Sequence, residues 1–335
     1  MGIESEQLLP FEKIKREVFV RKEMPTSPKF GKRPEDRTTH EHIQYGIVNI
    51  DKPAGPTSHQ VSGYVKQILH LSKAGHSGTL DPNVTGVLPV ALGEGTKVIQ
   101  ALLPAGKEYV CIMHLHGDYS EEHIRKVCAS FIGKIKQLPP LKSAVKREWR
   151  YRKIYYLDVL EIDGRDVLFR VGCQAGTYIR RLCADIGKAL GSNGHMQELR
   201  RTKAGCFSED NLCTMQDVAD AFWYWKQENN DTLIRKHILP MEQAVAHLPK
   251  VWVFDTTVDT LCHGASLNTP GISKVESDIQ VEDLVAIMSL KDELVAFGKA
   301  HMISKEMQKK ERGLAVKIER VFMKPGIYPK VQMRG

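Results

Sequence analysis

The spacing of apolar residues changes along the chain and predicts three successive regions. From about 45 to 249, short apolar runs alternate with stretches whose apolar residues recur every three or four positions, which is typical of strands and helices in one mixed domain. After Pro249, short apolar runs bounded by Gly and Pro predict a small β-domain. We therefore expect an N-terminal extension over 1–44, a main domain over 45–249 and a β-domain over 250–330.

The same periodicity predicts the individual elements of the main domain. Apolar runs of four to seven residues predict strands, and apolar residues at helical spacing predict helices. The predicted elements are a strand at 47–50, a helix at 59–71 capped by Ser58, a helix at 97–103, a strand from 107, a helix at 121–131, a hairpin of 154–160 and 167–171 around Asp163-Gly164, a helix through Leu182, Ile186 and Leu190 that ends at Gly191, and mainly helical structure from 222 to 248.

One stretch, Gly75–Pro89, does not fit either period in its front half. It holds three glycines and two prolines. Glycine permits positive φ, and proline fixes φ and removes a hydrogen-bond donor. We expect a shaped loop there, followed by a short buried element at Val87–Leu92. The loop carries one carboxylate, Asp81, and one imidazole, His76. Taken by itself, an Asp in such a loop is most often a turn former.

Composition narrows the classes of function. The chain has 335 residues, a net charge of +8 and 42% hydrophobic residues, which is a globular composition with a basic balance that favours a polyanionic partner. No apolar run is long enough to predict a membrane-spanning helix, and the N-terminus lacks a signal-peptide core. The seven cysteines are scattered without a Cys-x-x-Cys pair, which indicates reduced thiols in a cytoplasmic protein and argues against a zinc site.

The stretch 138–153 is the most basic part of the chain. Cations alternate there with aromatic residues, a composition that suits phosphate contacts combined with base stacking. A solvated charged loop is the alternative reading. The cations that we expect to contact a nucleic acid are Lys146, Arg147, Arg150 and Arg152, interleaved with Trp149 and Tyr151.

Several motifs in the main domain resemble one family. His-x-Gly-Thr-Leu-Asp-Pro followed by Gly-Val-Leu-Pro, at 76–89, resembles the catalytic loop of the TruB/dyskerin pseudouridine synthases. Asp-Lys-Pro-x-Gly-x-Thr-Ser, Lys-x-Tyr, Gly-Thr-Tyr-Ile-Arg and Leu-x-Arg-x-x-x-Gly follow in the family's order, at 51–58, 107–109, 176–180 and 199–205. The resemblance implies a mixed α/β domain with a largely antiparallel central sheet, and isomerisation of uridine in RNA to pseudouridine.

The resemblance also implies the catalytic roles. Asp81 is the essential carboxylate, which attacks the nucleotide at either the ribose or the base, and Arg180 pairs with it. Tyr109 packs on the flipped uracil, and Tyr178 is placed to move the C5 proton. No metal or organic cofactor is implied, because a carboxylate can perform the covalent step.

Further residues are expected to bind the RNA or shape the pocket. His76 positions the RNA, and Leu199 lines the base pocket. Lys52 either supports the floor of the site or faces a phosphate. Arg200, Arg201 and Lys203 are expected to face RNA.

The C-terminal region resembles a second family. Leu261-Cys-His-Gly, Leu267-x-x-Pro-Gly-Ile and the closing Tyr328-Pro resemble a PUA domain, which is an RNA-binding β-pseudobarrel. The layout looks most like the archaeal catalytic subunit of H/ACA ribonucleoproteins. That likeness implies transfer or ribosomal RNA as substrate, an H/ACA guide RNA, small accessory subunits, and an N-terminal extension that docks on the barrel. Two alternatives stay open: a catalytically idle RNA scaffold, and a standalone synthase for the T-loop uridine of transfer RNA.

Overall fold

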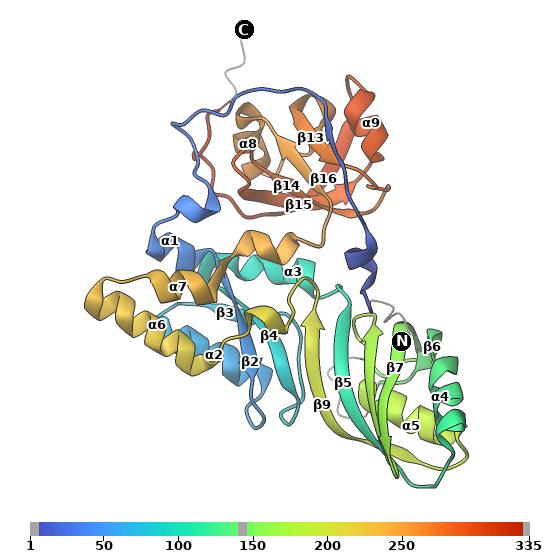
Figure 1. Ribbon diagram of the computed structural model, residues 1–335. Helices are drawn as coiled ribbons and strands as arrows, with labels where there is room; N and C mark the ends of the chain where they lie inside the picture. The colour runs from blue at the N-terminus through green and yellow to red at the C-terminus, as the bar shows by residue number, and fades with distance from the viewer. Residues whose placement is uncertain (1–6, 140–145, 331–335) are drawn as a thin grey trace, which may run out of the picture.

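The computed structural model describes residues 7–139 and 146–330, and within these residues the strands form two sheets in two stacked bodies (Figure 1). The larger body, which we call the main domain, is built on a nine-stranded sheet flanked by helices. The smaller body, which we call the barrel domain, is built on a seven-stranded curled sheet. The expectation of a mixed α/β domain with a separate small β-domain is confirmed. Among the described residues, no helix is long and apolar enough to cross a membrane.

The main sheet is antiparallel except where β4 and β9 run parallel, so the predicted largely antiparallel sheet is confirmed. Its strands are, in spatial order, β10 (Ile238–Pro240), β2 (Gly46–Lys52), β4 (Thr85–Leu92), β9 (Gly194–Ala204), β5 (Lys107–Leu115), β8 (Asp166–Cys173), β7 (Arg150–Asp163) and β6 (Gly133–Gln137), with β3 (Ala74–His76) paired to β4.

The edge of β4 opposite β2 is shared by two strands. β9 pairs with its first two residues, and β3 pairs antiparallel with its last three. The segment that joins the end of β3 to the start of β4 is a loop, Ser77–Val84. This loop contains Asp81.

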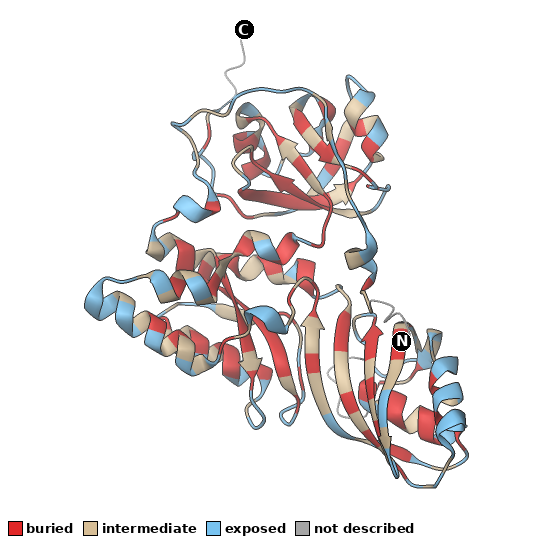
Figure 2. Ribbon diagram, in the orientation of Figure 1, coloured by how far each residue is buried: buried red, intermediate tan, exposed pale blue. Residues whose placement is uncertain are grey.

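Helices cover the two ends of the main sheet. Apolar residues of α4 and α5, such as Ile124 and Leu182, pack on β5, β7 and β8, and those of α2 and α6, such as Val61 and Val218, pack on β2 and β4. Figure 2 shows the buried residues concentrated along the strands and on the inner faces of these helices. The helices are α1 (Thr39–Gln44), α2 (Ser58–Ile68), α3 (Ile99–Leu102), α4 (Glu121–Ser130), α5 (Ile179–Ala189), α6 (Met215–Glu228) and α7 (Thr232–His237).

The barrel domain curls around its own apolar core, which includes Val251, Ile287 and Val295. Its sheet has the order β1 (Val18–Val20), β13 (Ile272–Glu276), β11 (Lys250–Val253), β14 (Leu284–Met288), β15 (Leu294–Ala300), β16 (Leu314–Val321) and β12 (Leu267–Asn268), with helices α8 (Asp255–Cys262) and α9 (Ser304–Lys309).

The N-terminal segment contacts both bodies. Its strand β1 adds to the edge of β13, so Phe19 packs against the barrel core. Leu9 is fully buried, and the Glu12 carboxylate lies 2.9 Å from the Lys203 ammonium on β9. A second apolar cluster joins Met241 and Val245 of the main domain to Met288 and Phe297 of the barrel. Because this core is continuous across Pro249, the division of the chain into 1–44, 45–249 and 250–330 stays a prediction.

Several predicted boundaries need correction. The cap of α2 is Thr57, whose hydroxyl accepts from Gln60 N, while the Ser58 hydroxyl bonds the backbone of Leu80. The start of the glycine-rich stretch is strand β3, because the free edge of β4 accepts it. Helical structure does not continue from 222 to 248: α6 ends before Asn229, which has a φ of 51°, and a short strand, β10, follows α7. The segment 97–103 begins as a 3-10 turn.

Candidate active site

Asp81 and Arg180 meet at the mouth of the β3–β4 loop. Arg180 is the second residue of α5, and its Nη2 donates to Asp81 Oδ2 at 2.8 Å across 99 positions of sequence. The Arg180 side chain is 63% exposed and that of Asp81 56% exposed, so the ion pair faces solvent. The geometry brings together the two residues that the family resemblance pairs, on a surface open to a large substrate.

The backbone of this loop is held from below by Lys52. Its side chain is completely buried, and its ammonium donates to the carbonyls of Pro82 at 2.8 Å, Val84 at 2.9 Å and Pro53 at 2.9 Å. All three N–H donors are used, and none is left for a phosphate. Of the two roles expected for Lys52, its contacts therefore support the structural one, and its placement among the RNA-binding residues is corrected.

Ser58 makes a hydrogen bond to the catalytic loop that sequence reasoning missed. Leu80 N donates to Ser58 Oγ at 2.8 Å, which fixes the residue before Asp81 to the first turn of α2. Val84 N in turn donates to the Asp81 carbonyl at 3.0 Å. The position of Ser58 next to the true cap, Thr57, was the available signal, because a buried hydroxyl in a first turn needs a partner.

Tyr109 lies on β5 directly opposite Arg201 on β9. Tyr109 is half-buried, and burial raises the pKa of its hydroxyl. Arg201 is only 1% exposed; its Nε donates to the Val87 carbonyl at 2.7 Å and its Nη2 to the Gly78 carbonyl at 3.4 Å. The expectation that Arg201 faces RNA is wrong, because the strand turns this side chain into the protein.

His76 lies at the end of β3, half-buried beside the loop. Its Nδ1 accepts from Gly78 N at 3.3 Å, an arrangement that leaves the proton on Nε2. Burial and the positive charge of Arg201 lower the pKa of His76. A neutral imidazole with a free Nε2–H suits a residue that donates to a nucleotide.

Tyr178 is the N-cap of α5 and therefore lies two residues from Arg180. Its backbone is fixed by Gln137, whose side-chain oxygen accepts from Tyr178 N at 3.0 Å and whose amide donates to Tyr178 O at 3.2 Å. Gln137 is 2% exposed and was not singled out by sequence reasoning. Leu199, on β9, is half-buried against the same apolar core that holds α5.

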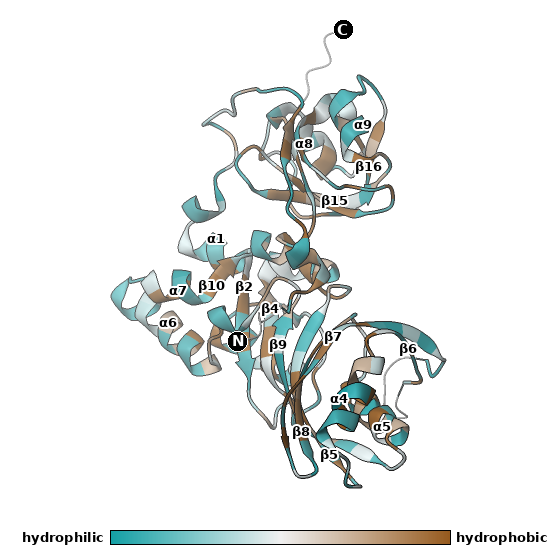
Figure 3. Ribbon diagram, turned by 45° about the vertical axis from the view of Figure 1, so that its right-hand side comes forward, coloured by the Kyte–Doolittle hydropathy of each residue, from teal (hydrophilic) through white to brown (hydrophobic). Residues whose placement is uncertain are grey.

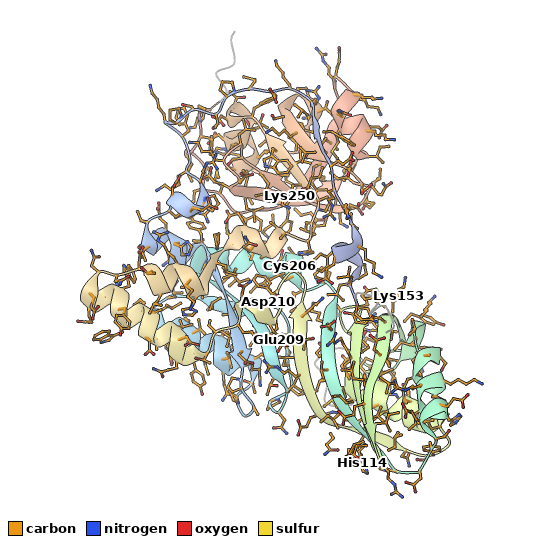
Figure 4. The ribbon with its side chains drawn as sticks, viewed as in Figure 1. His114, Lys153, Cys206, Glu209, Asp210 and Lys250 are labelled. Atoms are coloured by element: carbon orange, nitrogen blue, oxygen red, sulfur yellow. The ribbon has the colours of Figure 1, made fainter. Side chains whose placement is uncertain are left out.

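The predicted RNA-facing cations fall into two groups. On β9, Arg200 is paired with Asp51 at 3.0 Å and with Glu209 at 2.6 Å, and Lys203 is paired with Glu12. Glu209 follows β9 in the chain (Figure 4). These charges are already partly neutralised, so we expect them to bind phosphate more weakly than the sequence alone suggests.

The second group forms the basic hairpin, which we define as β6, the described residues 146–149, and the start of β7. Lys146 and Arg147 are exposed, and Arg150 and Arg152 are half-buried. Trp149 and Tyr151 are each 55% exposed, with Lys136 Nζ 5.1 Å and Lys134 Nζ 4.2 Å from their ring centroids. Figure 3 shows this edge coloured hydrophilic around β6. Residues 140–145 of the predicted basic stretch lie outside the described residues.

Comparisons with known proteins cover almost the whole chain. Family models match the N-terminal domain of TruB family pseudouridylate synthases at 66–179, the C-terminal domain of tRNA pseudouridylate synthase B at 180–246, a PUA domain at 249–322 and a DKCLD domain at 6–62. Described residues of the site fall in the first two of these matches, apart from Lys52 and Ser58. Within residues 7–139 and 146–330, no three His, Cys, Asp or Glu side chains are grouped to hold a metal ion.

Individual relatives match over their full length. Proteins described as probable tRNA pseudouridine synthase B from Methanopyrus kandleri and Pyrococcus furiosus are each 57% identical over 330 residues, covering 98% of this chain and 97% of theirs. A solved Cbf5–Nop10–Gar1 complex contains a chain 57% identical with a TM-score of 0.92, covering 97% of this chain and 99% of that one. An H/ACA ribonucleoprotein bound to substrate RNA contains a chain 54% identical with a TM-score of 0.91, covering 97% and 100%.

Proposed function

This chain belongs to the TruB family of pseudouridine synthases, which convert uridine in RNA to pseudouridine, and we propose that Asp81 performs the covalent step. The observation that carries the assignment is the 2.8 Å ion pair between Asp81 and Arg180 at the solvent-open mouth of the loop. In the net reaction the bond from N1 of uracil to C1′ breaks, a bond from C5 to C1′ forms, and the C5 proton is replaced by one on N1. A carboxylate nucleophile can cover this reaction without a cofactor.

The surrounding residues take separate roles in the proposal. The uracil leaves its stack to reach Asp81, and the half-buried ring of Tyr109 offers it a flat partner. Tyr178, at the start of α5, lies near enough to Arg180 in the chain to serve the C5 proton. Leu199 supplies an apolar wall, and His76 donates from Nε2 to the RNA.

We propose that the chain is the catalytic subunit of a guide-RNA ribonucleoprotein of the H/ACA type. The support is its likeness over nearly its whole length to chains solved together with Nop10, Gar1 and substrate RNA. In this proposal residues 250–330 hold RNA, residues 1–44 dock on them, and small accessory proteins complete the particle. Its substrates are ribosomal RNA, the T-loop uridine of transfer RNA, or both. A cytoplasmic location is part of the proposal, supported by seven free thiols.

The test follows tritium at C5 of uridine, because formation of the C5–C1′ bond releases it. Transfer RNA and a guide-matched RNA, each labelled at C5, are incubated with the full chain, with and without guide RNA and accessory proteins. Release from the guide-matched RNA only in the complete mixture supports the proposal. Release from transfer RNA alone, unaffected by a guide, would favour the standalone synthase. RNA binding without release in any mixture would favour the idle scaffold.

A further inference from the structure

Arg201 is a buried cation whose partners are unusual. Its side chain is 1% exposed, yet among the described residues the ion pairs do not include it. A charge removed from water normally requires a carboxylate or a full set of hydrogen bonds. Arg201 instead donates to two backbone carbonyls, of Gly78 and Val87, and it lies directly opposite Tyr109 on the neighbouring strand β5. All three of these residues belong to the proposed active site or its immediate frame.

The two carbonyls lie on opposite sides of Asp81 in the chain. Gly78 is in the loop before Asp81, and Val87 is in β4, after the loop has ended. One planar guanidinium thus spans the base of the segment that presents the carboxylate. The backbone of Arg201 also lies close to the start of β4. A Cβ at Gly86, whose φ is +99°, would lie 2.2 Å from the Arg201 carbonyl oxygen. Only a glycine at 86 allows this approach.

Lys52 supports the same loop but does not make the same connection. It bonds the carbonyls of Pro82 and Val84, inside the span that Arg201 closes, and within the described residues its hydrogen bonds reach only the loop and Pro53. Of these two cations, Arg201 is the one that is also the cross-strand neighbour of Tyr109, the residue proposed to pack on the base. Its side chain and its strand position together therefore link the loop of the nucleophile to the residue that orients the substrate.

We propose that Arg201 is a positioning residue for the reaction, which fixes the distance between the Asp81 loop and Tyr109 because its rigid planar group bonds the loop from the position opposite Tyr109. A lysine offers a point charge on a flexible stem and cannot reproduce the planar fork. The proposal rests on the proposed function, because it assigns Tyr109 and Asp81 to one substrate. It predicts that loss of the fork slows the chemical step more than it weakens RNA binding, since small displacements of reacting groups cost large factors in rate.

The experiment compares full-length variants in single-turnover tritium release from C5-labelled RNA, in whichever mixture the wild-type chain is active. Arg201→Met removes the fork, Arg201→Lys keeps only the charge, and Tyr109→Phe removes only the hydroxyl of the residue opposite Arg201. We expect Arg201→Met and Arg201→Lys to slow release by about 100-fold. RNA affinity should change by less than about 3-fold. The double variant Arg201→Met/Tyr109→Phe should release tritium less than about 3-fold more slowly than the slower of the two single variants. The reason is that both substitutions act on the same connection.

Lys107→Met is the matched control. Lys107 is another buried cation of the same sheet, and it donates to the carbonyls of Leu102, Leu103 and Ala105, which lie outside the Asp81 loop. It should lower the melting temperature and leave the release rate of the folded fraction within about 3-fold of wild type. A merely structural Arg201 would behave in the same way.

Three outcomes would overturn the proposal. These are a folded Arg201→Met or Arg201→Lys chain that releases tritium at close to the wild-type rate, a loss explained wholly by RNA affinity, and rate effects of Arg201→Met and Tyr109→Phe that multiply. If Arg201→Met does not fold, Arg201→Lys and the double variant Arg201→Lys/Tyr109→Phe are compared instead, by the same release rates and RNA affinities. An inactive wild-type chain in every mixture would instead refute the proposed function itself.

Discussion

Arg180 reaches Asp81 from the first turn of α5, and the resulting ion pair is more than half exposed on both sides. An exposed pair contributes little to folding, typically about 0–1 kcal/mol. The pair therefore does not serve stability, and a substrate that covers it would remove water and strengthen its electrostatic coupling. This separation of stability from activity makes the site straightforward to test.

Asp81→Asn keeps the shape of the side chain but removes its charge and its nucleophilicity. We expect no detectable tritium release, RNA binding within a few fold of wild type, and a free energy of unfolding within about 1 kcal/mol. Turnover by this variant at more than a trace level would exclude Asp81 from the mechanism.

Arg180→Ala should slow turnover by about 100-fold or more, as loss of one preorganised charged donor does in other enzymes. Because the Asp81 side chain is more than half exposed, losing its partner leaves no buried charge, and the expected change in unfolding free energy is small, below about 1 kcal/mol. Urea titration of the variant measures it; a cost of several kcal/mol would show that Asp81 is buried in solution.

Lys52→Met tests the floor of the loop. The substitution leaves the carbonyls of Pro82 and Val84 without their buried donor, which costs about 1–3 kcal/mol for each unsatisfied group. We expect the unfolding free energy to fall by about 3 kcal/mol and turnover to fall because the loop loosens. Lys126→Met, on the exposed face of α4, is the control and should change stability by less than about 0.5 kcal/mol. Equal effects of the two would refute the structural role of Lys52.

Features set by local backbone geometry could be predicted from the sequence, whereas contacts between distant elements could not. The glycines and prolines of the loop restrict backbone geometry locally, so the loop and the buried run after it could be predicted. Amphipathic periods located the helices around Glu121 and Leu182. The nearness of Asp81 and Arg180 could not follow from periodicity, because their contact depends on how β4 and α5 pack, and it entered through the family resemblance.

Arg200 and Arg201 show where composition misleads. Both were expected to face RNA, but neighbours in a strand point to opposite faces. Arg201 is buried, and Arg200 is paired with acidic residues on the other side. Alternation from Leu199, expected to line the pocket, could have indicated that Arg201 turns inward. Its partners depend on the register of β9 against β4 and β5, which no local pattern contains.

The basic hairpin should control the salt dependence of RNA binding. Replacing Lys146, Arg147, Arg150 and Arg152 by Ala should weaken binding regardless of RNA sequence. Each lost phosphate contact should lower the slope of log K against log salt by about 0.7–0.9. A control of equal charge replaces Arg125, Lys126, Arg165 and Lys188, which are all exposed on other parts of the main domain. An unchanged slope in the first variant, or equal changes in both, would identify the hairpin as solvated charge.

Two buried histidines should make stability depend on pH. Burial lowers the pKa of His247 to about 4, and it also lowers the pKa of His42; their Nε2 atoms lie 3.0 Å from Ala101 O and 2.6 Å from Ile238 O. Between pH 6.5 and 4 the unfolded chain binds a proton at position 247 that the folded chain does not. Stability therefore falls as pH falls through this window, by at most about 1.4 kcal/mol per pH unit for each histidine.

The variant His247→Gln isolates this effect, because its amide can still donate to Ala101 O. Urea unfolding at pH 7, 6 and 5 should show a shallower loss of stability for the variant than for wild type. Parallel curves for the two chains would mean that His247 titrates normally in the folded state.

Deleting 250–335 tests whether the barrel domain captures the RNA. Truncation removes the partner strand of β1 and uncovers Met241 and Val245, which pack against Met288 and Phe297 across the boundary. We therefore expect lower solubility, together with loss of guide-directed turnover. Asp81 and Arg180 should remain assembled, because their contacts lie within the main domain. A cooperative melting transition and residual tritium release at high RNA concentration would show that the main domain is intact. Guide-directed turnover that survives in the truncated chain would exclude the barrel as the RNA anchor.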